Sequence, residues 1–163
     1  MIHLVAGDLL YTTAQVVVHG IAAFDPMDQG LALALHKRFP EMHKQFHRWC
    51  HQHNPKGGEL WFWRSDQGKI IVNLLTQDRW EGHTHRPAKA TTQNVNHALH
   101  ALEKLSRKEG FSSLALPRLA TGVGGLDWND VLPLIENRLG DLGIPVYVYD
   151  DYRPGEKAKE PQE

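Results

Sequence analysis

Residues 114–128 read LALPRLATGVGGLDW, and this stretch contains a short strand, a glycine-rich loop and the start of a helix. Ser113 to Pro117 is an apolar run typical of a buried strand. Three glycines within Thr121 to Leu126 let backbone N–H groups turn toward a ligand without obstruction by side chains. Asp127 is a good N-cap for the helix that follows, whose dipole adds partial positive charge. The stretch therefore predicts an anion-binding junction between a strand and a helix.

Strands and helices alternate along the rest of the chain. Apolar, β-branched or aromatic runs predict strands over 2–6, 15–19, 59–64, 69–75 and 144–149. Helical spacing predicts helices over 30–39 and 40–50, a longer one that begins at Pro87 and ends at Gly110, and a last one that begins after Asp127. This order predicts a three-layer α/β/α domain with a mixed, largely parallel central sheet and an antiparallel pair at one edge.

Length and composition restrict the classes of function. The chain has 163 residues, which is enough for one domain, and we assign it residues 1–150 and expect residues 151–163 to be a mobile polar tail. Lys and Arg number 18 against 19 Asp and Glu, so the long-range positive field of a dedicated nucleic-acid binder is excluded. The single cysteine, Cys50, excludes an intramolecular disulfide and fits a reducing compartment. With no signal peptide and no apolar run long enough to cross a membrane, we expect a cytoplasmic protein.

Two glycine-bearing junctions suggest a diphosphate ligand. Gly30 begins a helix after a strand and loop, as the loop Thr121 to Leu126 does later, and neither junction contains Lys or Arg. Alternatively, these glycines serve only tight turns. No Gly-Lys-Ser/Thr and no G-x-G-x-x-G pattern is present, which excludes P-loop and dinucleotide-binding readings. Asp8, after the first strand, is able to accept a hydrogen bond from an exocyclic amine such as adenine N6, or it caps a local turn.

The motifs together resemble the macro domain family. The similar segments, in order, are Gly7-Asp8-Leu9-Leu10, Val18-His19-Gly20, Gly30 to Leu35 with Phe39-Pro40, and Leu116-Pro117-Arg118 leading to Gly122-Val123-Gly124-Gly125-Leu126-Asp127-Trp128. The resemblance covers about residues 1–150 and is nearest to the branch of terminal ADP-ribose protein glycohydrolases and of antitoxins that remove ADP-ribose from DNA. It implies an ADP-ribose-binding domain that hydrolyses an ADP-ribosyl bond or processes ADP-ribose 1″-phosphate. The alternative is a non-catalytic reader of ADP-ribose or a related nucleotide.

The resemblance also implies which residues bind ADP-ribose. Asp8 and the Leu9 backbone would contact adenine, and Tyr149 is the nearest aromatic candidate to pack on it, unless Tyr149 is an ordinary sheet residue. Gly30, Leu31 and Ala32 would contact the diphosphate from one side, and the glycine-rich loop from the other. The full implied set is Asp8, Leu9, Gly20, Ile21, Gly30, Leu31, Ala32, Thr121, Gly122, Val123, Gly124, Gly125, Leu126 and Tyr149.

Three departures from the family pattern bear on catalysis. The lysine that active members of this branch carry is Gln77 here, which cannot form a Schiff base with an opened ribose. Gly124 stands where some members place an acidic residue in the glycine-rich loop, and Ala22 and Ala23 stand where many members hold an asparagine. These changes leave the proposed binding surface largely intact and remove the family's catalytic side chains.

Other polar residues near these positions are candidates to replace the missing groups. We expect Asp25, Asp78 or His19 to position a water at the anomeric carbon, with His83 and His85 also close in sequence. Each of them also has an ordinary alternative role as a loop or strand-end polar group.

Histidine is the one residue type in surplus, with 11 in the chain. His43, His47 and His51 recur every four residues and so share one helix face, with Cys50 and His53 beside them. A metal site is geometrically possible, but a polar helix face explains the pattern without a visible carboxylate ligand, so we expect neither metal nor cofactor. The expected partner is ADP-ribose or an ADP-ribosylated macromolecule, nucleic acid only where it carries ADP-ribose, and no membrane. We expect a monomer.

Overall fold

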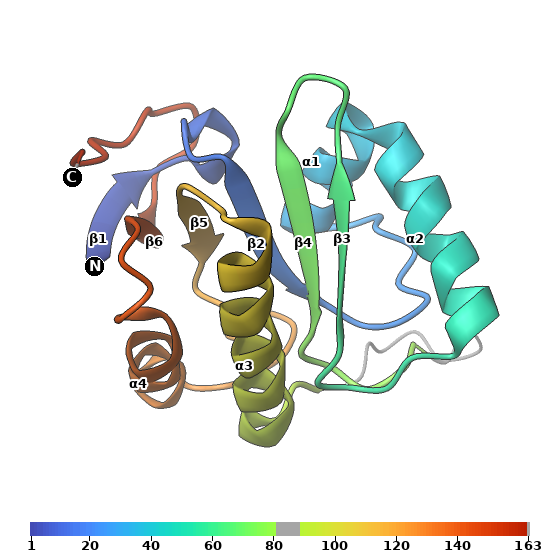
Figure 1. Ribbon diagram of the computed structural model, residues 1–163. Helices are drawn as coiled ribbons and strands as arrows, with labels where there is room; N and C mark the ends of the chain where they lie inside the picture. Colours follow the sequence, from blue (N-terminus) through green and yellow to red (C-terminus); the bar gives the residue numbers. More distant parts are fainter. Residues whose placement is uncertain (81–88, 163) are drawn as a thin grey trace.

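A mixed sheet of six strands lies between two layers of helices (Figure 1). The computed structural model describes residues 1–80 and 89–162. The strands are β1 Ile2–Gly7, β2 Val16–Ile21, β3 Leu60–Arg64, β4 Ile70–Leu75, β5 Leu114–Pro117 and β6 Val146–Tyr152. The helices are α1 Gly30–Arg38, α2 Pro40–His53, α3 Thr92–Glu109 and α4 Trp128–Leu139, with a short 3-10 helix, η1, at Leu9–Tyr11. The predicted α/β/α architecture is confirmed.

The strands follow the order β1-β6-β5-β2-β4-β3 in the sheet. The carboxyl ends of the five parallel strands, all except β3, therefore lie at the same edge. All neighbouring pairs are parallel except β3 with β4, which form the antiparallel pair predicted at an edge. Because ligands of such sheets bind beyond the carboxyl ends of the strands, the loops after β2, β4 and β5 are the ones that position a site.

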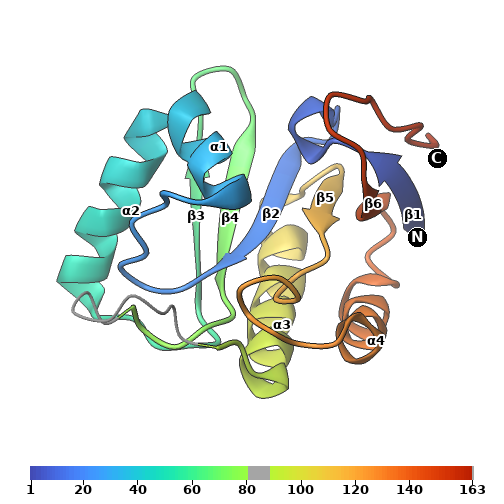
Figure 2. The ribbon, with the colours of Figure 1, turned by 180° about the vertical axis from the view of Figure 1, so that it is seen from behind.

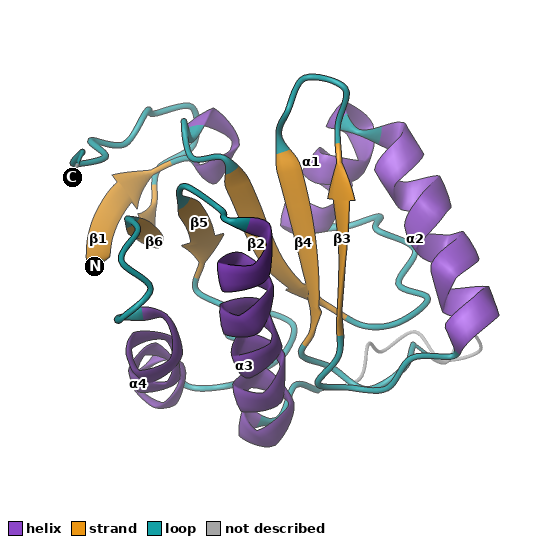
Figure 3. Ribbon diagram, in the orientation of Figure 1, coloured by secondary structure: helices purple, strands orange, loops and turns teal. Residues whose placement is uncertain are grey.

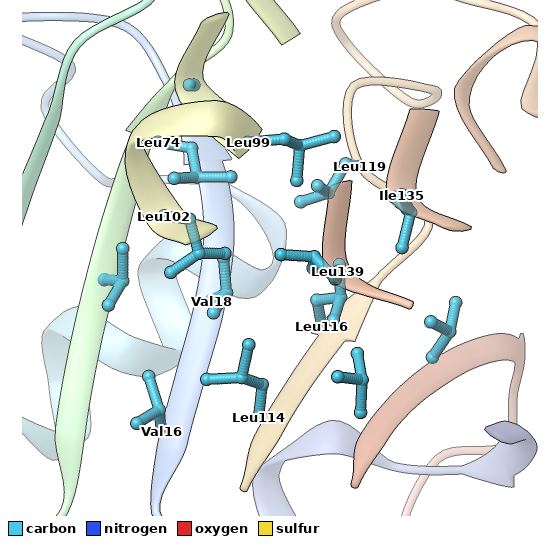
Figure 4. Close-up of a cluster of buried hydrophobic side chains, with 14 of the residues drawn as sticks. Val16, Val18, Leu74, Leu99, Leu102, Leu114, Leu116, Leu119, Ile135 and Leu139 are labelled. Atoms are coloured by element: carbon cyan, nitrogen blue, oxygen red, sulfur yellow. The ribbon is translucent and has the colours of Figure 1, made fainter. Parts of the chain in front are cut away.

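Alternation along the strands builds two apolar cores. Val16, Val18, Leu114 and Leu116 face α3 and α4 and form one core with Leu99, Leu102, Ile135 and Leu139 (Figure 4). Val17, Ile71, Ala115 and Tyr147 point to the other face and form the second core with Leu35, Met42 and Phe46 of α1 and α2. Figures 2 and 3 show these helices on the two faces of the sheet. Successive strand residues point to opposite faces, so this pattern requires three layers.

Several element boundaries differ from the sequence predictions by a few residues. The long helix begins at Thr92, where the Thr91 hydroxyl accepts a hydrogen bond from Asn94 N at 3.0 Å, and Pro87 lies outside the described residues. The last strand begins after Pro145 because proline has no N–H for the ladder, and it continues to Tyr152 because β1 supplies a partner as far as Gly7. The prediction that Asp127 caps the last helix is confirmed by its hydrogen bond from Asn129 N at 2.9 Å.

The C-terminal segment after β6, for which the sequence predicts a mobile tail, folds back across β1 and η1 in the structure (Figure 1). Arg153 N donates to Gly7 O at 3.1 Å, and Asp8 N donates to Glu156 O at 2.7 Å. Ala158 is buried in the second core. The Glu160 carboxylate accepts hydrogen bonds from both hydroxyls and one backbone N–H of Thr12 and Thr13, and from the Tyr149 hydroxyl. A polar sequence without periodicity is therefore ordered by hydrogen bonds and one small apolar anchor.

We expect Glu160→Ala to lower the free energy of unfolding by about 1–2 kcal/mol, because several hydrogen bonds to a half-buried carboxylate are lost. Burial raises the pKa of Glu160, but hydrogen bonds from Thr12, Tyr149 and Thr13 together bring it below its ordinary value. This stabilisation is therefore present above the ordinary carboxyl pKa and is lost as the pH falls through the lower folded value. Urea titration measures both effects.

The matched control is Glu156→Ala in the same segment. Its side chain forms a long ion pair with Arg153 at 4.0 Å, and both groups are exposed, so its loss should change stability very little. Equal destabilisation by the two variants would contradict the role given to Glu160.

The described helices include none that is long and apolar enough to cross a membrane.

Candidate functional site

A cavity of about 440 Å³ opens at the carboxyl ends of β2, β4 and β5. Three segments form its wall: the end of β2 with the loop into α1, the residues after β4, and the β5–α4 loop. Of the implied binding set, the wall includes Gly20, Ile21, Gly30, Leu31, Ala32, Gly122, Val123 and Gly124. Two loops that are separated by some ninety residues in sequence therefore meet at one cavity.

The start of α1 presents unpaired backbone donors to this cavity. Gln29 occupies the N-cap position and forms no side-chain hydrogen bond to the helix, and Gly30 follows with φ of +59° and open space around its Cα. The first N–H groups of a helix have no partner within the helix, and the helix dipole favours an anion there. This end of the cavity is suited to phosphate oxygens.

The glycine-rich loop faces the start of α1 across the cavity and is fixed by its own backbone. Leu126 N donates to Ala120 O at 3.0 Å, and Gly125 N donates to Gly122 O at 3.1 Å. A Cβ on Gly124 would lie 2.6 Å from the Ala120 carbonyl oxygen, closer than side chains approach. Position 124 therefore requires glycine in this loop conformation, which explains in physical terms why no acidic side chain stands there.

Asp25, in the loop after β2, is a titratable residue of the cavity wall. Its Oδ1 accepts a hydrogen bond from Met27 N at 2.8 Å, which fixes the side chain on the loop. Burial raises the pKa of Asp25, and the neighbouring Asp28 acts in the same direction, while the Met27 hydrogen bond and His47 oppose it. A carboxyl group with a raised pKa at a cavity wall is suited to proton transfer.

His19 also lies on the cavity wall and is 2% exposed. Its Nε2 is 2.7 Å from Asn73 Oδ1 in the neighbouring strand β4, so this nitrogen donates to the amide oxygen. Burial lowers the pKa of His19 to about 4, which outweighs the opposing hydrogen bond to Asn73. The ring is therefore neutral at pH 7 and acts as a hydrogen-bonding group rather than a cation.

Asp78 does not lie on the described wall of this cavity. It lines a separate hollow of about 410 Å³ beside Lys56 and Arg79, where its Oδ1 accepts a hydrogen bond from Asn94 Nδ2 at 3.3 Å. The two flanking residues, Gln77 and Trp80, do line the main cavity, and the sequence analysis gave no role to Trp80. His83 and His85 lie outside the described residues.

The residues implied for adenine lie beneath the C-terminal segment. Asp8 is buried, and its two carboxylate oxygens accept hydrogen bonds from Leu10 N at 3.0 Å and Gly155 N at 2.9 Å. Tyr149 is buried in the second core and donates its hydroxyl to Glu160, and Leu9 packs in the same core. These three residues stand outside the cavity wall, as do Thr121, Gly125 and Leu126, and their contact with a ligand stays a prediction.

Comparison with known proteins places this geometry in a family. The family model described as Macro domain matches residues 18–135, the part of the chain that contains the whole cavity wall. The chain belongs to the macro domain family.

Relatives within the family include named glycohydrolases. The DNA ADP-ribosyl glycohydrolase of Mycobacterium tuberculosis (strain ATCC 25618 / H37Rv) is 30% identical over 129 residues, which are 77% of this chain and 35% of that protein. The ADP-ribose glycohydrolase OARD1 of Homo sapiens is 28% identical over 133 residues, 82% of this chain and 80% of that protein. The solved macrodomain of Mycobacterium tuberculosis DarG matches with a TM-score of 0.83 at 27% identity, over 95% of this chain and 99% of that one. The chain spans about two fifths or less of the length of the bacterial relatives that it matches.

Few titratable side chains are placed on the described wall of the cavity. Gln77 stands in the position implied for the branch lysine, lines the cavity and pairs with Ala90 in an isolated β-bridge. Within residues 1–80 and 89–162, no cluster of three or more His, Cys, Asp or Glu side chains is arranged to bind a metal ion. The titratable side chains available on the cavity wall therefore include Asp25, Asp28 and His19.

Proposed function

We propose that this macro domain binds ADP-ribose in the cavity and hydrolyses an ADP-ribosyl bond. One observation carries the proposal. The start of α1 at Gly30 and the glycine-rich loop before α4 line the same cavity, and Asp25 lies on its wall. The family membership and the two relatives named as glycohydrolases support it.

Backbone groups would bind the charged part of the ligand. The uncapped start of α1 and the loop around Gly122 and Gly124 flank the cavity, and a diphosphate placed between them receives N–H groups from both sides. This mode of binding requires few cations, which agrees with a chain of formal net charge -1. Adenine would then extend toward the end of the sheet where Asp8 lies.

Asp25 would supply the proton transfer for hydrolysis. As the ionised carboxylate it takes a proton from a water that attacks the anomeric carbon of the distal ribose, and the leaving group departs from the same carbon. Gln77 cannot form a Schiff base, so the reaction proceeds without a covalent lysine intermediate at that position. Neutral His19, fixed by Asn73, would orient the ribose by a hydrogen bond.

A non-catalytic reader is the competing function, and the replacement of the family's acidic and lysine side chains by Gly124 and Gln77 favours it. Both functions predict binding of ADP-ribose, which isothermal titration calorimetry measures. Only the enzyme releases ADP-ribose from ADP-ribosylated DNA, from ADP-ribosylated protein, or phosphate from ADP-ribose 1″-phosphate. Binding without turnover on all three substrates would establish the reader, and absence of binding would refute both.

We also propose that the domain acts as a cytoplasmic monomer. Cys50 is buried and forms no disulfide, as expected in a reducing compartment. Size-exclusion chromatography with light scattering tests the monomer.

A further inference from the structure

A row of histidines lies directly behind the loop that forms one side of the cavity. His36 comes from α1, and His43, His47 and His51 come from one face of α2. The rings of His36 and His43 stack with centroids 3.8 Å apart, and those of His43 and His47 are 4.5 Å apart. None of the four lies on the cavity wall, so the row does not contact a ligand there.

The row is hydrogen bonded to the backbone of residues 24–29. His47 Nε2 lies 2.9 Å from the carbonyl oxygen of Asp25, and His36 Nδ1 lies 3.2 Å from that of Met27. Carbonyl oxygens only accept, so both ring nitrogens donate. His51 meets the Phe24 ring edge-on with centroids 5.0 Å apart. The three contacts follow the loop along its length.

The loop needs this support because its backbone is strained. Phe24 and Met27 have φ of 65° and 54°, the left-handed region that non-glycine residues rarely adopt. Asp25 stands between them, and its carboxyl group reaches the cavity while its carbonyl oxygen binds His47. The position of the carboxyl group therefore depends on a histidine that lies behind it.

We propose that His36, His43 and His47 are positioning residues that hold the Asp25 loop against the cavity, and that protonation of the row loosens this loop and weakens ligand binding. The proposal rests on the function proposed above, because it concerns the same cavity. It gives the histidine-rich helix a role that requires no metal.

Charge explains why the row responds to pH. Two protonated rings stacked at 3.8 Å repel one another, so His36 and His43 cannot both be charged in this arrangement. Burial lowers the pKa of His43, and the neighbouring His36 and His47 lower it further, while a hydrogen bond to the Pro26 backbone opposes them. The folded arrangement thus favours a neutral His43 ring.

Charged groups of both signs are packed around the histidine row. Asp25 and Asp28 approach it from the loop, and Arg79, after β4, lies over the Phe24 ring at 4.5 Å. The two carboxylates therefore place negative charge beside the row, and the guanidinium places positive charge at its far end. For a histidine with a lowered folded pKa, the stabilising contribution is complete above the ordinary value and is lost as the pH falls below it.

The test compares three variants by calorimetry with ADP-ribose at about pH 7.5 and about pH 5.5, on either side of the ordinary histidine pKa. His47→Gln keeps a donor at the place of Nε2 but cannot become charged, whereas His47→Ala removes the donor. His53→Gln is the matched control, since His53 lies on the same helix, is exposed, and within the described residues has its hydrogen bond and ring stacking with Trp49 of that helix.

We expect wild-type affinity to fall by about tenfold between the two pH values, and the His47→Gln affinity by less than about threefold. His47→Ala should bind about two- to tenfold more weakly than wild type at the higher pH, because one hydrogen bond to the loop is lost, and His47→Gln should restore that loss. His53→Gln should follow wild type. A pH dependence as large in His47→Gln as in wild type would show that charging His47 does not loosen the loop, and it would overturn the proposal.

A measurement without ligand separates this proposal from the proposed function. In the free protein, the backbone amide resonances of Asp25 and Met27 should shift between the two pH values in wild type and not in His47→Gln. If wild type binds no ADP-ribose, the proposed function fails, and these resonances still test the histidine row. Amide shifts that are identical in the two proteins would refute it.

Discussion

Asp25→Asn is expected to reduce the turnover of an ADP-ribosylated substrate by about 100-fold or more, the contribution typical of a general acid or base. The amide has nearly the same shape and still accepts the hydrogen bond from Met27 N, so the loop should keep its conformation. It cannot take a proton from water. ADP-ribose affinity should therefore change little while kcat falls, and single-turnover kinetics with calorimetry measures the two quantities separately.

The pH dependence of turnover gives a second test of Asp25. Burial raises its pKa, so the ionised form that acts as a base is lost at a higher pH than for an ordinary aspartate. In wild type, kcat should decline as the pH falls through this raised value, and Asp25→Asn should show no such decline in its residual rate.

Asp28→Asn provides the comparison of charge. Asp28 belongs to the same loop and cavity wall but is exposed, so its substitution removes the same charge without removing a buried carboxyl group. If Asp28→Asn lowers kcat as much as Asp25→Asn does, the effect comes from the negative charge of the loop as a whole. That result would contradict a specific role for Asp25.

Much of the fold follows from patterns that lie within single segments. The continuous apolar runs Val16 to Val18 and Ile70 to Val72 are typical of strands buried on both faces, and the order of strands and helices then limits the topology. The two glycine-bearing junctions are also local, and their meeting at one cavity follows because parallel strands end at the same edge.

The remaining features depend on contacts between distant segments. The order of the C-terminal segment comes from Glu160 meeting Thr12 and Thr13, a pairing across nearly the whole chain that no local pattern indicates. For the same reason, the sequence could not show that this segment lies over Asp8.

The sequence shows the spacing of the histidines on α2, but it does not show which part of the chain these histidines contact. The i, i+4 repeat indicates a shared face, but only the tertiary structure shows that this face meets the carbonyl groups of Asp25 and Met27. Likewise, Asp25 and Asp78 are equivalent candidates in the sequence, and the path of the chain after β4 directs Asp78 into a different hollow.

Gly124→Ala is expected to lower the free energy of unfolding by roughly 2–3 kcal/mol and to weaken ADP-ribose binding. The added Cβ would lie 2.6 Å from the Ala120 carbonyl oxygen and 2.9 Å from the Ala90 Cβ, so the loop backbone has to move. Gly124→Asp adds the same clash and a carboxylate, and it should be no more active than wild type. Urea titration and calorimetry measure stability and affinity.

Gly122→Ala is the matched control, because Gly122 lies in the same loop and on the same cavity wall but has no atom within 4 Å of its added Cβ. It should leave stability within about 0.5 kcal/mol of wild type, as expected for a substitution into open space. Equal destabilisation at positions 122 and 124 would show that the loop tolerates no side chain at all and would remove the specific explanation for Gly124.

If Gly124→Ala destabilises the protein and Gly122→Ala does not, the loop conformation itself excludes the family's acidic side chain from position 124. An enzyme with this loop must then obtain its carboxylate from another wall of the cavity, and the loop after β2 provides one in Asp25.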